Sequence, residues 1–139
     1  MRERVYIDSN VFIFPVIYED VSKAEKAKEI LKGIEDKRFS AYTSTLTWDE
    51  VTWVVLKIMG RTDSIEVGRK LLGFPNLRFI GVSEEVISKA QTLMEKYELN
   101  PRDAIHCSSA LIRGIKRIIS DDKDLEIVEE IERTPIEAL

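Results

Sequence analysis

A carboxylate near the start of the chain stands where a buried residue is expected. Asp8 ends the apolar run VYI, and after Ser9 and Asn10 a second apolar run begins at Val11. A carboxylate placed between two apolar segments is costly to bury without a partner. Asp8 is therefore a candidate for a functional site, because buried acids with shifted pKa values gather in such sites.

Further acids follow in three separate segments. Glu50 lies in TSTLTWDEV, Asp103 in NPRDAIHCSSA, and Asp121 and Asp122 in IISDDKDL. Each segment has an ordinary explanation on its own, because acids in the first turn of a helix complement its dipole and SDDKDL reads equally as a solvated helix cap. Gathered together, however, the carboxylates would repel one another unless a cation neutralised them. Oxygen ligands of this kind suit Mg²⁺ or Mn²⁺, and one cysteine with one histidine makes no zinc cluster.

The elements that must position these acids alternate along the chain. Hydrophobic spacing and turn residues predict strands at 4–7, 39–43, 77–82, 115–119 and 134–136, and helices at 21–37, 47–59, 62–72, 84–97, 101–113 and 122–131. Ser22 with Glu25 predicts a capping box, Ser83 predicts the cap of the helix at 84–97, and Pro101 and Gly114 predict the limits of the helix at 101–113. The triplet from Asp8 to Asn10 is expected to be a short exposed break. Strands that alternate with helices predict an α/β fold with a mainly parallel sheet. Ligands of such sheets bind outside the carboxyl ends of the strands, where Asp8 and Asp122 fall.

Length and composition set the broad class. The 139 residues fit one domain, 1–139, with 44% hydrophobic and 33% charged residues. The net charge of −4 argues against non-specific duplex DNA binding, although carboxylates in a metal site contribute to it. No apolar run approaches the roughly 20 residues of a membrane span, and no signal peptide is expected at the N-terminus. The single Cys107 excludes an internal disulfide, so a cytoplasmic protein is expected.

Four quoted segments together resemble the PIN domain family of nucleases: YIDSNVFI, TSTLTWDEV, NPRDAIHCSSA and IISDDKDL. No single segment is specific, but their order and spacing match the family over essentially the whole chain. The resemblance implies a three-layer α/β/α sandwich with an acidic site at the carboxyl edge of the sheet. It also implies Mg²⁺- or Mn²⁺-dependent cleavage of single-stranded RNA.

The resemblance also implies roles for individual acids. The family's acids correspond in order to Asp8, Glu50, Asp103 and Asp122. Asp8, Asp103 and Asp122 would hold one or two ions, and Glu50 would bind through water or help to deprotonate the attacking water. The fourth assignment rests on Ser120, which supplies the hydroxyl that the family places two residues before this acid; Asp121 and Asp124 are nearby substitutes. Ser120, Asn10 and Asp121 are expected beside the ligands as orienting groups.

The resemblance further suggests partners. Small stand-alone members look like VapC toxins of VapBC toxin–antitoxin pairs, which are homodimers neutralised by an antitoxin. Other small members process RNA, so both roles stay open. The apolar content of the segment 51–74 also favours a homodimer.

Basic residues should guide RNA to an acidic site. Arg102 is next to Asp103, and four further positive residues occupy a segment with few acids: Lys57, Arg61, Arg69 and Lys70. A solvated helix face explains those four equally well. His106 follows Asp103 by three residues, and a packed or capping histidine is favoured over a general base. Trp48 and Trp53 could stack on RNA bases, but helix packing or a dimer interface is the favoured interpretation.

Two other functions fit parts of the pattern. A haloacid-dehalogenase-type phosphatase also begins with a strand that ends in aspartate, but it needs a second aspartate where this chain has Asn10. A PIN-like binding module without activity would typically lack one of the acids, and here all four are present. A metal-dependent ribonuclease is therefore the expected function.

Overall fold

The five strands form one parallel sheet. The structure, a computed structural model, describes residues 2–18 and 21–138. In the described residues the strands are β1 (Arg4–Ile7), β2 (Ser40–Ser44), β3 (Leu77–Ile80), β4 (Arg117–Ile119) and β5 (Glu132–Thr134). Their order in the sheet is β3-β2-β1-β4-β5, and every neighbouring pair is parallel. The strand β1, which delivers Asp8, is therefore central.

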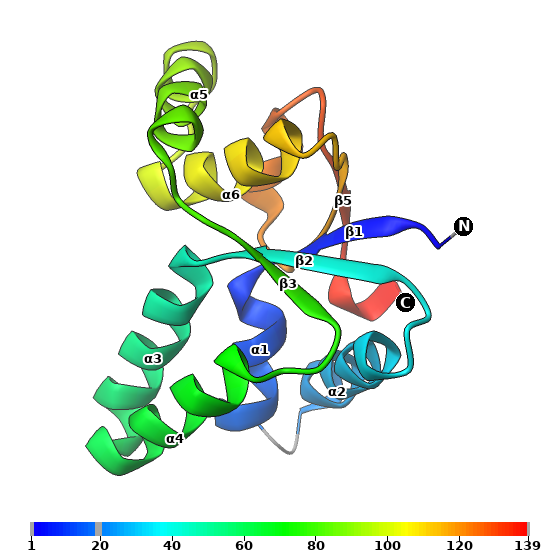
Figure 1. The fold of residues 1–139 in the computed structure, drawn as a ribbon, viewed down its shortest axis with the longest axis vertical. Coiled ribbons are helices and arrows are strands. Elements are labelled where there is room, and N and C mark those ends of the chain that lie inside the picture. Colours follow the sequence, from blue (N-terminus) through cyan, green and yellow to red (C-terminus); the bar gives the residue numbers. More distant parts are fainter. Residues whose placement is uncertain (1, 19–20, 139) are drawn as a thin grey trace.

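Helices cover both faces of this sheet. They are α1 (Ser9–Ile17), α2 (Ser22–Glu35), α3 (Leu46–Met59), α4 (Arg61–Leu72), α5 (Glu84–Lys96) and α6 (Pro101–Ile112), with short 3-10 helices η1 (Lys123–Ile127) and η2 (Ile136–Ala138). Helices α5 and α6 lie on one face, and α1 to α4 lie on the other (Figure 1). The predicted three-layer α/β/α sandwich is confirmed. Among the described residues, no helix combines the length and the apolar character that a membrane span requires.

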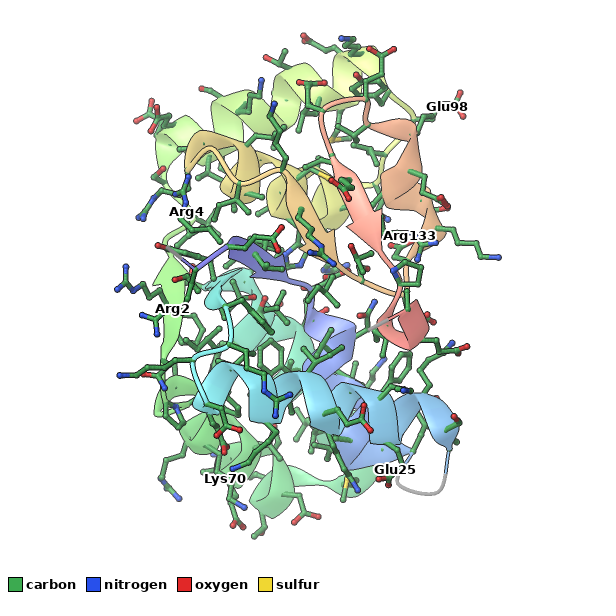
Figure 2. The ribbon with its side chains drawn as sticks, turned by 90° about the vertical axis from the view of Figure 1, so that its right-hand side faces the viewer. Arg2, Arg4, Glu25, Lys70, Glu98 and Arg133 are labelled. Carbon is green, nitrogen blue, oxygen red and sulfur yellow. The ribbon has the colours of Figure 1, made fainter. Side chains whose placement is uncertain are left out.

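Two hydrophobic cores lie on the two faces of the sheet. Successive strand residues point to opposite faces, so Tyr6 and Ile118 enter the core under α5 and α6, while Val5, Ile7 and Ile119 enter the core under α1 to α4. The central strands β1 and β4 are covered on both faces, which explains their short runs of apolar and β-branched residues. Exposed charged side chains, among them those of Glu25, Lys70 and Glu98, lie on the outside (Figure 2).

The exposed break expected after β1 is wrong. Helix α1 begins at Ser9, and Asp8 is its N-cap, whose Oδ1 accepts a hydrogen bond from the Ser9 backbone N–H at 2.8 Å. Asp8 is 4% exposed and Ser9 is 8% exposed. The chain therefore passes from strand to helix without a loop, and this turn buries the carboxylate instead of exposing it.

Three other local predictions are corrected. Val21 is the N-cap of α2 and makes no side-chain cap bond, so the capping box of Ser22 is wrong. The helix expected at 122–131 is only the 3-10 helix η1, and the last strand is Glu132–Thr134 instead of 134–136. Strand pairing sets the position of β5, because Thr134 aligns with Ile119 of β4.

Two glycines shape the hairpin of α3 and α4. Gly60 ends α3 and caps α4 with a backbone φ of 98°, a conformation that residues other than glycine rarely adopt. A Cβ on Gly68 would lie 2.9 Å from both Thr52 Cγ2 and Trp48 Nε1. Gly68 therefore lets the two helices approach closely.

Candidate active site

The predicted acids stand at the starts of three helices and at the end of one strand. Asp8 joins β1 to α1, Glu50 lies one turn into α3, Asp103 lies in the first turn of α6, and Asp122 follows β4. The parallel strands point their carboxyl ends to one edge, so these segments meet there. We call Asp8, Glu50, Asp103 and Asp122 the acidic cluster.

Asp8 is buried with its oxygens partnered. Besides the Ser9 bond at Oδ1, the Ser120 hydroxyl donates to Asp8 Oδ2 at 2.5 Å. Ser120 Oγ in turn accepts from the Asp122 backbone N–H at 3.0 Å and from Asn10 Nδ2 at 3.3 Å. Asn10 Nδ2 also lies 3.5 Å from Asp8 Oδ2. These bonds tie the loop after β4 to the start of α1, so they hold Asp8 and the backbone of Asp122 in register.

Asp103 lies at a helix start that its own cap orients. Asn100 is the N-cap of α6; its Oδ1 accepts from the Asp103 backbone N–H, and its Nδ2 donates to Asp103 Oδ2, both at 2.9 Å. Burial, followed by the neighbouring Asp122 and Asp8 carboxylates, raises the pKa of Asp103 to about 7. Ionisation of Asp103 and Asp122 together is therefore unfavourable, and a bound cation would relieve the repulsion between the two carboxylates.

Two acidic groupings have the spacing of a cation site. Asp8, Glu50 and His106 can each offer an atom within 4.8 Å of the others, and so can Asp103, Asp122 and Asp124. The charge of Asp8 acts on Asp103, so the two groupings adjoin. Oxygen donors predominate, and this donor set fits Mg²⁺ or Mn²⁺.

Asp121 has a different environment from Asp122. Its Oδ2 lies 2.6 Å from Nζ of Lys23 at the start of α2. The Asp121 backbone N–H donates to Asn10 Oδ1 at 3.4 Å. Asp121 is thus already paired with a cation, whereas Asp122 adjoins Asp103. Lys23 gave no signal in the sequence, because 98 residues separate it from Asp121.

His106 contacts two acids of the cluster, in addition to the packing expected for it. It is 1% exposed, its Nε2 lies 2.5 Å from Glu50 Oε1 and 3.6 Å from Asp8 Oδ1, and its Nδ1 is hydrogen-bonded to the Tyr6 hydroxyl at 2.6 Å. Burial alone lowers the pKa of His106, but the carboxylates of Asp8, Glu50 and Asp103 outweigh burial and raise it.

Tyr6 is a residue that the sequence reasoning missed. A signal was available, because Tyr6 lies in β1 two residues before Asp8, and side chains two residues apart in extended backbone share a face. The same alternation places Tyr6 under α6, where its ring packs edge-on against His106. A tyrosine two residues before a candidate acid is therefore a candidate neighbour of the site.

The predicted RNA-binding residues fall into three places. Arg102 lines a surface depression together with Glu50, Asn100 and Asp103. Lys70 lies apart from it, paired with Glu66 at 3.4 Å. Whether any of them contacts RNA stays a prediction.

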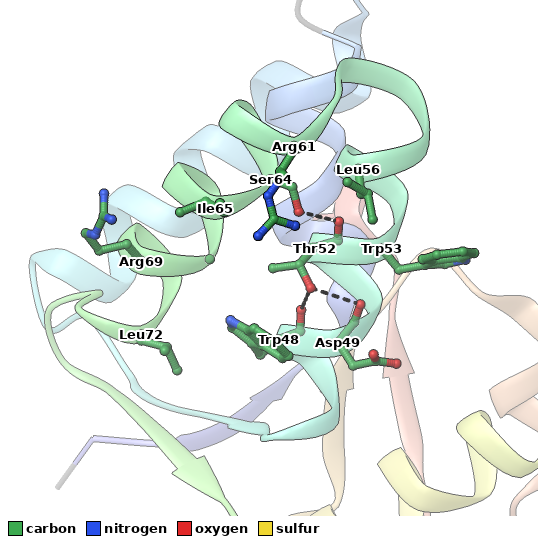
Figure 3. A pocket seen from close by; sticks show the side chains of 11 residues that line it. Trp48, Asp49, Thr52, Trp53, Leu56, Arg61, Ser64, Ile65, Arg69 and Leu72 are labelled. Atoms are coloured by element: carbon green, nitrogen blue, oxygen red, sulfur yellow. Dashed lines mark hydrogen bonds between the residues drawn. The ribbon is translucent and has the colours of Figure 1, made fainter.

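The other basic residues lie at a groove between α3 and α4. Its lining combines aromatic, apolar and basic side chains: Trp48, Asp49, Thr52, Trp53, Leu56, Arg61, Ser64, Ile65, Gly68, Arg69 and Leu72 (Figure 3). Lys57 Nζ lies 5.3 Å from the Trp53 ring centroid, beside this α3–α4 groove. Asp49 also lines the depression that holds Glu50 and Asp103, so the groove adjoins the acidic cluster. Trp48 and Trp53 are half exposed and do not pack as core residues.

The fold and the cluster define a class: a parallel-sheet sandwich with carboxylates gathered at one edge. The profile of the PIN domain family matches residues 5–131. The chain belongs to the PIN domain family.

Individual proteins are similar to this chain over nearly its whole length. The chain is 23% identical over 143 residues to Ribonuclease VapC2 of Methanocaldococcus jannaschii, covering 94% of this chain and 93% of the relative. Its fold is similar to that of VapBC2 from Rickettsia felis bound to a DNA fragment from its promoter (TM-score 0.74, 12% identity, 95% and 98% of the two chains covered). It is also similar to VapC20 of Mycobacterium tuberculosis, a toxin that cleaves the sarcin–ricin loop (TM-score 0.72, 14% identity, 90% and 97% covered).

Proposed function

We propose that this chain is a divalent-metal-dependent endoribonuclease that cleaves single-stranded RNA. The observation that carries the proposal is the acidic cluster, in which four segments bring carboxylates to one edge of the sheet. Structural reasons alone do not account for such a cluster, because the proximity of Asp122 and Asp8 to the buried Asp103 carries an electrostatic cost. Membership of the PIN domain family supports the same reaction class.

Mg²⁺ or Mn²⁺ fits the oxygen donors of the cluster. Asp8, Asp103 and Asp122 would hold one or two ions, with Asp124 close enough to contribute. A bound ion supplies Lewis acidity at the scissile phosphate and lowers the pKa of a bound water. Its charge would also remove the repulsion that raises the pKa of Asp103.

The remaining residues prepare the reaction. Ser120 and Asn10 fix the orientation of Asp8 through the hydrogen bonds at its Oδ2. Glu50, with its side chain 17% exposed, is the group placed to accept a proton from the attacking water. Arg102, at the rim of the same depression, would bind an RNA phosphate. Attack in line with the leaving oxygen would leave a 5′-phosphate and a 3′-hydroxyl.

The proposed biological role is that of the toxin in a VapBC-type pair, with an antitoxin protein as partner. The support comes from relatives that are named as toxins or as VapBC complexes. We also propose a homodimer. Large apolar side chains of α3 and α4 are exposed, with Ile58 at 60% and Leu72 at 61%, and a second copy of the chain would cover such a surface.

The decisive experiment removes one charge from the cluster. Asp8→Asn keeps the shape of the side chain, so we expect a folded protein by circular dichroism and a fall in kcat of at least about 100-fold. The substrate is a single-stranded RNA oligonucleotide, with Mg²⁺, Mn²⁺ or EDTA added. Asp36→Asn is the matched control, because Asp36 is an exposed acid at the end of α2 that lines neither the depression at the cluster nor the α3–α4 groove, and it should keep the parent rate.

Two results would overturn this proposal. One is a parent protein whose cleavage of RNA is unchanged by EDTA. The other is a folded Asp8→Asn variant that cleaves at the parent rate with Mg²⁺. A parent that neither cleaves RNA nor gains thermal stability from Mn²⁺ would instead indicate a PIN-like binding module.

A further inference from the structure

A hydrogen-bonded chain of three side chains runs from the protein core to the acidic cluster. Tyr6 in β1 is fully buried, His106 in α6 is 1% exposed, and the Glu50 side chain in α3 is 17% exposed. The Tyr6 hydroxyl is hydrogen-bonded to His106 Nδ1 at 2.6 Å, and His106 Nε2 is hydrogen-bonded to Glu50 Oε1 at 2.5 Å. The chain thus connects three elements that meet only in the folded protein.

Glu50 depends on this chain for its orientation. Among the described residues, His106 is the one hydrogen-bond partner of its carboxylate. A glutamate has three side-chain torsions, and at a partly exposed position it would sample several rotamers without such a partner. His106 cannot itself move away, because both of its ring nitrogens are engaged and α6 packs it in the core.

We propose that His106 is a positioning residue for Glu50, held in its own orientation by Tyr6. This inference rests on the proposed function, in which Glu50 accepts a proton from the attacking water. The imidazole fixes Oε1, so the second carboxylate oxygen is left for the water. The Tyr6 hydroxyl is hydrogen-bonded to Nδ1 and the Tyr6 ring packs edge-on against the imidazole, so Tyr6 fixes the plane of the His106 ring.

The distances argue against His106 as a metal ligand. Two donor atoms on one octahedral ion at 2.0–2.1 Å are about 2.9 Å apart or more. His106 Nε2 and Glu50 Oε1 are at hydrogen-bonding distance, closer than two ligands of one such ion, so an ion bound to both atoms would have to displace this bond. The geometry therefore assigns the nitrogen to Glu50.

A double-mutant cycle tests whether His106 acts through Glu50. In the parent, His106→Leu should lower kcat about 10- to 100-fold with little change in KM for RNA, as for other residues that orient a catalytic group. In a Glu50→Gln background the same substitution should change kcat by less than about twofold, because the group that it positions is gone. His106→Gln, which retains an N–H donor, should recover part of the loss.

Two further variants keep the test decisive if His106→Leu does not fold. Tyr6→Phe removes one oxygen and should lower kcat about 3- to 10-fold in the parent, and not in the Glu50→Gln background. Cys107→Ala is the control. Cys107 is the buried residue next to His106 in α6, and it has no hydrogen bond to Glu50 among the described residues. It should leave kcat unchanged.

The thermal unfolding midpoint provides a readout that needs no activity. The shifts caused by His106→Gln and Glu50→Gln in metal-free protein should be non-additive, because both alter the same hydrogen bond. This cycle separates the two proposals: a parent without ribonuclease activity ends the proposed function, while additive shifts end the positioning role.

Other outcomes also count against the positioning role. Equal losses of kcat with and without Glu50 would mean that His106 supports the fold alone. A loss of Mn²⁺ affinity on His106→Gln in the Glu50→Gln background would mean that His106 binds the metal. Either result overturns the inference.

Discussion

The acidic cluster and the α3–α4 groove adjoin each other through Asp49, yet they are built in opposite ways. The cluster is held by hydrogen bonds between residues up to 112 positions apart; Asp8 and Asp103 are buried, and Glu50 and Asp122 are partly buried. The groove belongs to one local hairpin, and its tryptophans are half exposed. A pre-arranged polar site of the first kind suits chemistry, because its donors and acceptors need no rearrangement. An exposed aromatic and basic surface suits binding, where side chains adapt to a partner.

The largest expected effect separates Asp122, an acid of the cluster, from its neighbour Asp121. Asp122→Asn should lower kcat about 100-fold, because Asp122 adjoins Asp103 in the proposed metal site. Asp121→Asn is the matched control: Asp121 is paired with Lys23, so a fall of less than about tenfold is expected, as for a residue outside the ligands. Cleavage rates with saturating Mn²⁺ provide the measurement, and the reverse order would make Asp121 the fourth acid.

A smaller effect concerns the stability of the cluster without metal. The raised pKa of Asp103, about 7, means that the folded protein holds this proton more tightly than the unfolded chain does. The stabilisation is fully present below the unfolded pKa near 4 and is lost as pH rises through about 7. In EDTA, the free energy of unfolding should thus fall by on the order of 2 kcal/mol between about pH 5 and about pH 8.

Excess Mn²⁺ should oppose this loss, since a cation favours the ionised carboxylates. Urea unfolding at the two pH values, with EDTA or Mn²⁺, measures both effects. Asp103→Asn should remove most of the pH dependence. The part that remains should lie above about pH 6.5, where the raised pKa of His106 also lowers stability as pH rises. An unchanged fall between about pH 5 and about pH 6 would have to arise at a group other than Asp103.

The smallest expected effect lies in the groove. Arg61→Ala with Arg69→Ala should raise KM for RNA about 3- to 10-fold at low salt and leave kcat unchanged, because phosphate contacts contribute to binding and are screened by salt. Lys28→Ala, at an exposed lysine of α2 that pairs with Glu25, is the control. A fall in kcat with unchanged KM would show that the two regions are not separable in function.

The sequence was informative wherever a short segment carries its own physical signal. Residues 4–7 were predicted as a strand and are β1, and the predicted cap of α5 by Ser83 is present, with its hydroxyl accepting from the Val86 backbone N–H. Pro101 and Gly114 marked the limits of α6 to within about two residues. The order of the quoted segments led to the PIN domain family, which the family profile confirms.

Predictions from the local sequence were wrong where pairing or packing between distant elements determines the structure. The sequence could not show that α1 begins directly at Ser9, because the Ser120 bond that fixes Asp8 comes from 112 residues away. The capping box of Ser22 was wrong although the residue types suit it. The position of β5 depends on its register with β4, which the sequence around Thr134 does not contain.

The sequence by itself therefore determined which residue types reach the carboxyl edge of a parallel sheet, since strand and helix periodicity place Asp8, Asp103 and Asp122 there. Only the tertiary structure decided which side chain supports which acid. His106 reaches Glu50 across 56 residues, and Lys23 reaches Asp121 across 98. The physical reason is that hydrogen bonds and ion pairs act over a few ångströms in space, whatever the separation along the chain.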